Sequence, residues 1–520
     1  MKHFLAAVAI WVAALPAPVS AAEPDFAPLS RLIQQTKEAT GLPSGTAVAV
    51  VKDGKVIYEG YFGDADIAAR TPVTRETVFY IASATKPFFA LNALLREDAG
   101  QLDMRMSMRE MFPDLRFAGF DADAVTLGDL LVHGSGVDNP PLVWATAFSG
   151  VHDAASRRAL VGLSVADPEA AHGTFKYTNV GYNIASVWMD ARFGTPWQAQ
   201  LERAIFQPLD MRHTTAWISR ARAAGWILAK PYSFASEDPR VPLYLAKSDD
   251  TMQAAGGLVS TAPDLARFLL AQFPDARAGG LPAAAILRSH QTRIGLEAKY
   301  QDFQRSGYAW GWYTGPYKGR TMLHHFGGFA GFHAHLSFMP AEGIGLVVLN
   351  NEDMLGAQLT NLIADHVYGL LLGEKDIATT STRRFSELQE KARAFRRNTL
   401  AKREEIRARA WHLSAPRERY IGTYRHDLLG DMVVTREGPD GLRIRWGRLD
   451  TVATGAEQPD HVRVEFAPNS GQLLAFTVKD ARVESIAFDG MAFRKRDDAS
   501  VSGASASGAD VSGGSALSPR

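Results

Sequence analysis

The stretch "YIASATKPFFA", Tyr80 to Ala90, places a serine and a lysine three residues apart at the start of an apolar segment. Residues i and i+3 lie on one face of a helix, so the amine of Lys86 comes within reach of the Ser83 hydroxyl. Burial would lower the pKa of Lys86, because its charged form loses hydration, and a neutral amine can act as a base. Pro87 is compatible with the first helical turn. The stretch fits either a capped helix start or a nucleophile with its base.

A second stretch, "GTFKYTNVGYN", supplies side chains that complement such a pair. A Ser-x-x-Lys motif alone is weak, because roughly one is expected by chance in a chain of this length. Tyr177 and Asn179, two residues apart, would point to the same side of an extended segment. A tyrosine near an ammonium has its phenolate favoured and can pass a proton to a leaving group. Asn179 can hold a substrate amide and orient Lys86.

A third stretch, "HHFGGFAGF", predicts an imidazole at a strand edge beside the reacting centre. His325 would stand there, and Gly327 and Gly328 lack side chains, so a substrate could lie against the strand. The backbone amide of Gly328, together with that of Ser83, could form an oxyanion hole.

The histidines of this region also raise the alternative of a metal site, because His-x-His on a strand is a plausible ligand pair. Four histidines form the pattern: His324, His325, His333 and His335. Neighbouring residues of a strand point to opposite faces, and no acidic ligand lies nearby in sequence. We therefore predict no metal and no cofactor.

The order of the predicted elements indicates an α/β fold with a second domain after it. Two β-rich runs flank the turn dipeptide Asp53-Gly54, and later runs such as "IGLVVLNN" alternate like antiparallel strands. The N- and C-terminal parts of the first domain are expected to share one sheet, flanked by helices, with a helical insert between them. We assign residues 23–375 to this domain, 376–413 to a charged, solvated helical linker, 414–497 to a small all-β barrel-like domain, and 498–520 to a Ser/Gly-rich disordered tail.

The N-terminus and the composition indicate an exported protein. Residues 1–22 combine Lys2, an apolar run from Phe4 to Leu15 and a small-residue cleavage site, which is typical of a signal peptide. The chain has 520 residues, no cysteine and a formal net charge of zero. Zero charge argues against a nucleic-acid partner, and no later segment is apolar enough to span a membrane. A bacterial periplasm is the predicted location; the sequence does not indicate the oligomeric state.

Taken in order, the three stretches resemble the serine hydrolases of the β-lactamase and penicillin-binding-protein superfamily. The chain is most similar to the class C β-lactamase-like branch of D-aminopeptidases, D-Ala-D-Ala carboxypeptidases and esterases, from about Ser44 to Leu372. Segments such as "VTLGDLLVHGSGV", "AAGGLVSTAPDLARF" and "YAWGW" contribute to the resemblance. The C-terminal portion resembles the lipocalin-like domain of some family peptidases, which is expected to shape or cap the cleft or to mediate assembly.

The resemblance implies a role for each candidate residue. Ser83 is the acylated nucleophile, Lys86 the general base and Tyr177 the proton shuttle. Asn179 contacts the substrate and Lys86. His325 stands where many β-lactamases have a lysine, so efficient β-lactam hydrolysis is not expected. His325 would assist the reaction electrostatically or through Tyr177.

The implied activity is hydrolysis of amide bonds through an acyl-enzyme. The favoured substrates are short or unusual peptides, such as D-residue, peptidoglycan-derived or linear natural-product peptides. An esterase, lactonase or β-lactamase of the same fold remains open, as does a penicillin-binding sensor that acylates without turnover. A catalytically inactive binding module is opposed by the presence of Ser83, Lys86 and Tyr177.

Overall fold

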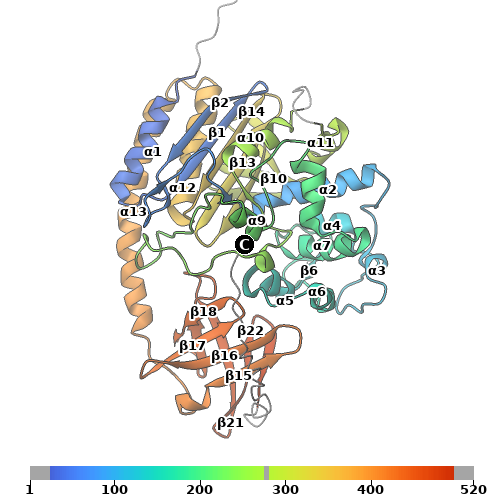
Figure 1. Ribbon diagram of the computed structural model, residues 1–520, viewed down its shortest axis with the longest axis vertical. Coiled ribbons are helices and arrows are strands. Elements are labelled where there is room, and N and C mark those ends of the chain that lie inside the picture. The colour runs from blue at the N-terminus through green and yellow to red at the C-terminus, as the bar shows by residue number, and fades with distance from the viewer. Residues whose placement is uncertain (1–23, 274–279, 497–520) are drawn as a thin grey trace, which may run out of the picture.

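The computed structural model describes residues 24–273 and 280–496. Figure 1 shows a sheet with helices on both faces, a helical region beside it, and a separate barrel below, reached by one long helix. The predicted signal peptide and the predicted Ser/Gly-rich tail lie outside the described residues. Within the described residues, no helix is both long enough and apolar enough to cross a membrane.

The central sheet joins the two ends of the first domain, as the sequence predicted. Its eight described strands run antiparallel in the order β2-β1-β14-β13-β12-β11-β10-β9. Asp53 and Gly54 make the predicted β1–β2 turn with positive φ angles of 49° and 77°. β1 then pairs with β14. The strands are β1 (Thr46–Lys52), β2 (Lys55–Phe62), β9 (Ile294–Tyr300), β10 (Phe303–Tyr308), β11 (Tyr313–Tyr317), β12 (Arg320–Phe329), β13 (Phe332–Met339) and β14 (Ile344–Asn350).

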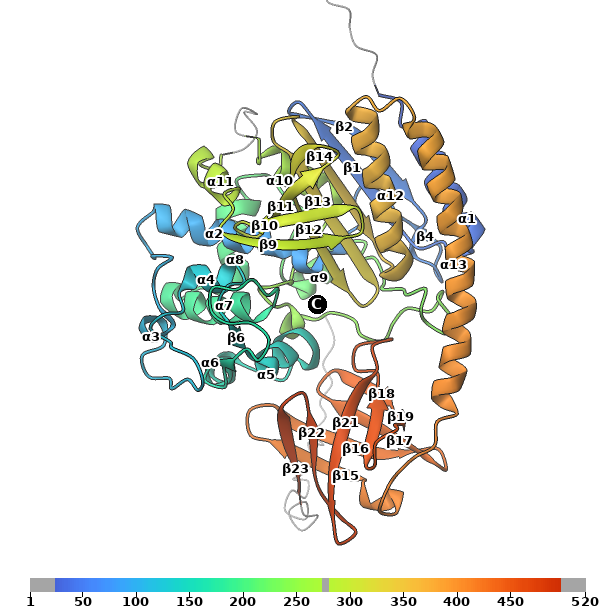
Figure 2. The ribbon, with the colours of Figure 1, turned by 180° about the vertical axis from the view of Figure 1, so that it is seen from behind.

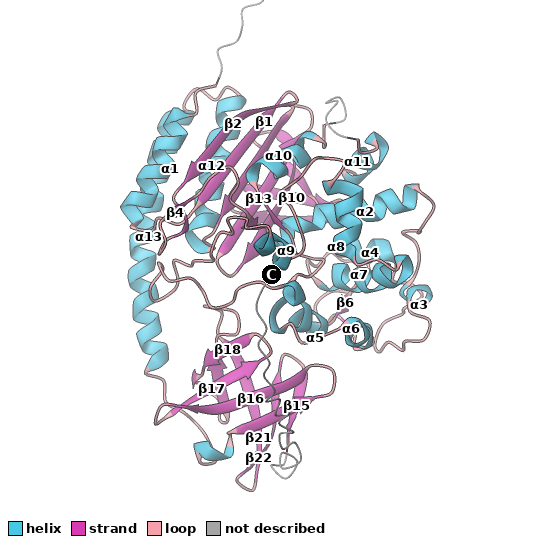
Figure 3. Cartoon of the chain, viewed as in Figure 1, coloured by secondary structure: helices cyan, strands magenta, loops and turns pink. Residues whose placement is uncertain are grey.

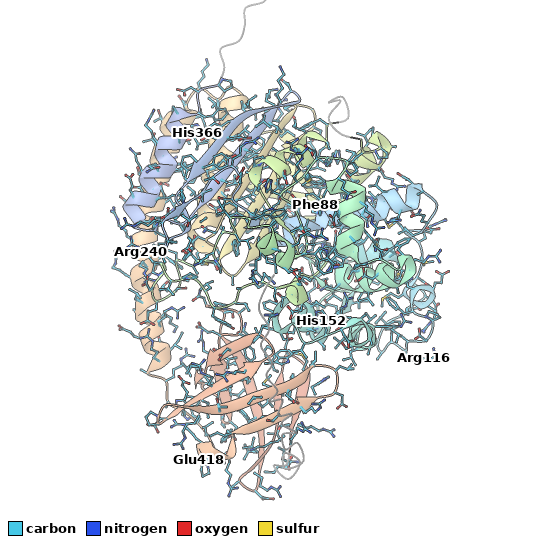
Figure 4. The ribbon with its side chains drawn as sticks, viewed as in Figure 1. Phe88, Arg116, His152, Arg240, His366 and Glu418 are labelled. Carbon is cyan, nitrogen blue, oxygen red and sulfur yellow. The ribbon has the colours of Figure 1, made fainter. Side chains whose placement is uncertain are left out.

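Helices bury both faces of this sheet. On one face lie α1 (Ala27–Thr40), α12 (Met354–Leu371) and α13 (Ile377–Arg407), seen together on the right of Figure 2. On the other face lie α10 (Ala262–Leu270) and α2 (Lys86–Asp98). Phe88 of α2, labelled in Figure 4, stacks on Phe268 of α10 with ring centroids 3.7 Å apart. The sheet is therefore the middle layer of an α/β/α sandwich.

The insert between β2 and β9 is mainly helical, as Figure 3 shows on the side of α2. Thr261 caps α10, and Pro263 lies in the first turn of that helix. The other helices and turns of the insert are α3 (Met108–Met111), α4 (Leu127–Leu131), α5 (Pro140–Trp144), η2 (Ala145–Ser149), α6 (Ala154–Val161), α7 (Val180–Phe193), α8 (Trp197–Leu201), η3 (Glu202–Phe206), α9 (Ile218–Ala223), η4 (Asp249–Thr251) and α11 (Ala283–Ser289). Its short strands are β3 (Asp64–Asp66), β4 (Thr71–Pro72), β5 (Phe79–Tyr80), β6 (Val137–Asp138), β7 (Val165–Ala166) and β8 (Val259–Ser260).

The charged helix α13 differs from the solvated linker expected from its composition. Phe385, Leu388 and Ala392 on one of its faces are buried, and the helix packs against α1 and α12. Arg384 also pairs with Asp365 of α12, with N and O 2.6 Å apart. The charges cover only the outer faces of a helix whose first half belongs to the sandwich.

The C-terminal strands form a nearly closed, barrel-like antiparallel sheet, which confirms the predicted fold class. The nine described strands follow the order β18-β17-β16-β15-β23-β22-β21-β20-β19. Aromatic side chains, among them Trp446, Phe466 and Phe493, fill the interior. The strands are β15 (Gly422–His426), β16 (Gly430–Glu437), β17 (Gly441–Trp446), β18 (Leu449–Val452), β19 (Thr454–Gly455), β20 (His461–Val464), β21 (Gln472–Lys479), β22 (Arg482–Phe488) and β23 (Met491–Lys495), preceded by the turn η5 (Arg417–Arg419).

Candidate active site

Ser83 lies on a tight turn between a short strand and a helix. The strand β5 ends at Tyr80, Ala82 has a positive φ of 44°, and a 3₁₀ turn, η1 (Ala82–Thr85), leads into α2. An alanine at positive φ is an uncommon conformation that the surroundings must hold in place. Ser83 is half-buried, while Ala82 and Ala84 on either side are buried. The turn thus leaves Ser83 accessible on an otherwise covered segment, and its side chain caps no helix.

The Lys86 amine joins three elements. Its Nζ lies 3.1 Å from Ser83 Oγ, 2.8 Å from Asn179 Oδ1 and 2.8 Å from the carbonyl oxygen of Ala255. Asn179 and Ala255 offer acceptor oxygens for two N–H groups. A neutral amine has two N–H groups and one lone pair, so these acceptors leave the lone pair directed at the Ser83 hydroxyl. This geometry suits proton transfer from Ser83 to Lys86.

Burial controls the protonation of Lys86. The residue is fully buried, and this desolvation holds the pKa of its amine well below the ordinary value. Among the described residues, no carboxylate pairs with Lys86 to offset this effect. The amine is therefore suited to accept a proton.

Tyr177 lies over the same amine, with Lys86 Nζ 4.7 Å from its ring centroid. The residue is 36% exposed overall, but its hydroxyl is buried. Burial raises the pKa of Tyr177 well above its ordinary value, and a hydrogen bond with Ser83 acts in the opposite direction. The expectation that a neighbouring ammonium favours the phenolate was wrong, because desolvation outweighs it. Tyr177 is held as a neutral phenol, which can donate a proton.

Asn179 meets Lys86 by a different backbone route from the one predicted. Its φ and ψ of −84° and −13° are helical, and it stands at the residue before α7, so the predicted extended conformation was wrong. The helix start turns its side chain toward α2, and the predicted contact with Lys86 is present. The contact between Asn179 and Lys86 therefore comes from two helix starts that lie side by side, not from the alternation of side chains along a strand.

His324 is the last residue of β12 that pairs with β11, and His325 follows it directly. Its Nδ1 lies 2.7 Å from the carbonyl oxygen of Phe326, so Nδ1 carries the proton, and Nε2 lies 3.3 Å from the Tyr308 hydroxyl. Burial holds the pKa of His325 well below its ordinary value. The imidazole is thus neutral and is oriented toward Tyr308; its ring centroid is 6.0 Å from that of Tyr177.

Two residues of this group were missed from the sequence. Tyr308 bonds to His325, and His133 packs against both Tyr177 and Tyr308, with ring centroids 4.6 and 4.7 Å away. His133 also accepts a hydrogen bond at Nδ1 from the Thr178 amide. Both residues stand in segments that carried the family resemblance, "YAWGW" and "VHGSGV", and this position was the available signal.

The two glycines after His325 differ in their surroundings. A Cβ on Gly327 would lie 1.8 Å from the carbonyl oxygen of Ile81, so β12 packs directly on the turn that carries Ser83. A Cβ on Gly328 would meet nothing within 4 Å, and Gly328 is exposed. Gly327 therefore permits close packing behind the nucleophile, whereas Gly328 makes no such contact.

The other histidines of the cluster face the opposite side of β12. His324 packs against Phe303 and Phe326, and His335 lies 2.6 Å from Ser337 Oγ through Nε2. His333 contacts Thr360 of α12 through Nδ1. Among the described residues, no three His, Asp or Glu side chains are grouped so as to hold a metal ion. These histidines belong to the packing of the sheet against α12.

The family model described as "Beta-lactamase" matches residues 29–365, a span that contains Ser83, Lys86, Tyr177 and His325. This chain belongs to the beta-lactamase family. Membership of this family makes the chain a serine hydrolase of the β-lactamase and penicillin-binding-protein superfamily.

Several known proteins align with much of the chain. It is 26% identical to the unguisins hydrolase of Aspergillus violaceofuscus over 470 residues, which cover 84% of this chain and 80% of that protein. It is 26% identical to penicillin-binding protein 4* of Bacillus subtilis over 340 residues, covering 62% and 72% of the two chains. The structure of the octameric penicillin-binding protein homologue from Pyrococcus abyssi superposes with a TM-score of 0.59 at 21% identity, covering 91% of this chain and all of that one.

Proposed function

We propose that this chain is an exported peptidase that hydrolyses amide bonds of short or unusual peptides through an acyl-enzyme on Ser83. The favoured substrates are D-residue, peptidoglycan-derived or linear natural-product peptides. The observation that carries the proposal is the position of Lys86 Nζ, 3.1 Å from Ser83 Oγ and held by two acceptor oxygens. The match to an unguisins hydrolase over most of both chains supports a hydrolytic role outside β-lactam chemistry.

The first half of the proposed reaction transfers the acyl group to Ser83. The Oγ attacks the carbonyl carbon while its proton passes to the neutral amine of Lys86. Tyr177 donates its phenolic proton to the leaving nitrogen as the C–N bond breaks, and Lys86 returns a proton to Tyr177. The backbone amides of Ser83 and Gly328 are the proposed oxyanion donors. His325 orients Tyr308 beside this relay.

The second half releases the acyl group as an acid. Water adds to the ester carbonyl, its proton passes to the Lys86–Tyr177 pair, and the bond to Ser83 Oγ breaks as the serine regains a proton. His325 stands in place of a lysine at this position, which favours peptides over β-lactams as substrates. Export is supported by the signal-peptide pattern of residues 1–22, which makes a bacterial periplasm the proposed location.

Two experiments test the proposal in sequence. A fluorophosphonate should add its mass at Ser83, and an adduct at another residue would overturn the nucleophile assignment. A turnover screen should then compare L- and D-aminoacyl amides, short peptides, p-nitrophenyl esters and a chromogenic cephalosporin. Preference for the amides and peptides is expected. Ester-only turnover would make the chain an esterase, and a slowly lost penicillin adduct without turnover would make it a sensor.

A further inference from the structure

One of the contacts between the barrel and the hydrolase domain is made at a short turn of the chain, the π-helical turn η2 (Ala145–Ser149). Trp144, the residue before it, inserts into the barrel. Its Nε1 donates to Asp489 Oδ2 at 2.6 Å, and its ring centroid lies 4.8 Å from that of Phe488. Trp446 and Phe466 of the barrel interior complete the contact. Trp144 is thus the anchor that joins the two hydrophobic cores.

A turn of the barrel holds the other end of η2. The amide of Arg448 donates to the carbonyl oxygen of Ser149 at 2.9 Å, and Arg448 Nε pairs with Asp250 at 2.8 Å. Gly447 is required for this approach, because it has a φ of +56° and a Cβ there would lie 2.2 Å from Ser149 O. His152, labelled in Figure 4, joins the same contact through the carbonyl oxygen of Asp250. The barrel therefore fixes both ends of η2.

The opposite side of η2 faces the substrate strand. Phe148 is half-buried, and its ring centroid lies 5.6 Å from that of Phe329, which directly follows the exposed Gly328 on β12. Lys247 fastens these two elements together. Its Nζ donates to the carbonyl oxygen of Ala147 at 2.7 Å and lies 3.6 Å from the Phe329 ring centroid. Phe148 and Phe329 form a partly open aromatic pair beside the proposed oxyanion donor.

The position of Phe329 along β12 indicates which part of a bound substrate would contact Phe148 and Phe329. Tyr177, the proposed donor to the leaving group, lies beside His325. Phe329 is at the other end of the free segment of β12, four residues further on. A substrate along this segment would have its leaving group near Tyr177 and its acyl group near Phe148 and Phe329.

We propose that Phe148 and Phe329 form a subsite for an aromatic or large aliphatic side chain on the acyl residue of the substrate. Phe148 is the specificity-determining residue, and the C-terminal barrel positions it through Trp144 and Arg448. π-Helical turns occur frequently at functional sites, because the extra residue re-aims side chains. This inference rests on the proposed acyl-enzyme at Ser83 and names the substrate class of that site.

The experiment uses the full chain and two diphenyl α-aminoalkylphosphonates that differ only in carrying a benzyl or a methyl side chain. The reaction forms a Ser83 Oγ–phosphorus bond and expels phenoxide, and the serine proton leaves through Lys86. The rate is followed by intact mass and the modified residue by peptide mapping. Both enantiomers of each reagent are tested, and the faster one is used. Because the readout is labelling, it does not depend on knowing the natural substrate.

The wild type should prefer the benzyl reagent, and Phe148→Ala should lower the benzyl-to-methyl rate ratio by about 10-fold, as expected when a hydrophobic pocket loses a contact of this size. Gly447→Ala should lower the ratio in the same direction, because its Cβ would push the barrel turn away from Ser149 O. Gly490→Ala is the matched control, because Gly490 also has a positive φ in a barrel turn but a Cβ there would meet nothing within 4 Å, and it should leave the ratio unchanged.

Each other outcome has one meaning. Equal losses for both reagents in Phe148→Ala, or no benzyl preference in the wild type, would overturn the subsite. A lowered ratio in Phe148→Ala with an unchanged ratio in Gly447→Ala would overturn the role of the barrel. If neither phosphonate nor a small fluorophosphonate modifies Ser83, the proposed function itself fails, which separates that failure from failure of the subsite.

Discussion

Lys86 and Lys247 are both buried lysines, but the groups that face their amines differ. Burial holds the pKa of both amines well below the ordinary value, and among the described residues neither amine pairs with a carboxylate. Both donate to backbone carbonyl groups. Lys86 also faces the hydroxyl of Ser83, whereas Lys247 lies over the ring of Phe329. Desolvation makes an amine available, and the neighbouring hydroxyl makes it a candidate base.

The comparison is tested most strongly by Lys86→Met, which removes the amine and keeps the length of the side chain. We expect kcat to fall by about 10² to 10⁴, the usual contribution of a positioned proton-transfer group. The free energy of unfolding should rise, because a buried amine that must lose its proton on folding is removed. Steady-state kinetics and urea unfolding at pH 7 measure the two effects. A rate near that of the wild type would rule Lys86 out as the base.

Tyr177→Phe removes the phenolic proton and keeps the ring over Lys86. We expect kcat for amide substrates to fall by about 10², because the leaving nitrogen needs a proton from Tyr177. An ester with a good leaving group, such as a p-nitrophenyl ester, should lose much less, since its leaving group departs without protonation. Equal losses on the amide and the ester would argue against proton donation to the leaving group.

Lys247→Met provides the contrast with Lys86→Met. We expect a loss in kcat of less than about 10-fold for a substrate with a small acyl side chain, because Lys247 touches neither Ser83 nor Tyr177 in the described structure. Kinetics of the two methionine variants under the same conditions give the comparison. A loss as large as that of Lys86→Met would show that burial alone does not distinguish the two sites.

The smallest expected effect concerns the histidines behind β12. Burial lowers the pKa of His333 to about 4, below the ~6.5 of an unfolded chain. Below about pH 6.5 the unfolded state therefore binds more protons, and the free energy of unfolding falls as pH falls toward 4. We expect His333 to contribute about 2 kcal/mol to the loss between pH 7 and 5. His333→Asn should reduce the pH slope in urea unfolding, and an unchanged slope would contradict this assignment.

Local sequence patterns predicted part of the fold and part of the site. Asp53-Gly54 predicted its turn, Pro87 lies in the first turn of α2, and the order of the elements predicted that the two ends of the first domain share one sheet. Ser83 and Lys86 are close because the spacing is a property of the helix start.

The remaining features depend on tertiary packing that local patterns do not encode. The Ala255 carbonyl group that holds Lys86 has no side-chain signal. Gly327 was interpreted as space for a substrate, and only the approach of Ile81 reveals its packing role. The neutral state of Tyr177 follows from burial, which its neighbours in sequence do not show. Composition marked α13 as charged but gave no sign of its buried face.

The most direct test of the account is the rate of fluorophosphonate labelling between pH 5 and 10 in the wild type and in Lys86→Met. Lys86 acts when neutral, so the wild-type rate should rise with pH through its depressed pKa and reach a plateau below the pKa of an ordinary lysine. The adduct should be on Ser83, and Lys86→Met should be slower by about 10² or more in the plateau region, with a smaller difference where Lys86 is protonated. Equal rates in the two proteins, or an adduct on another serine, would contradict the account.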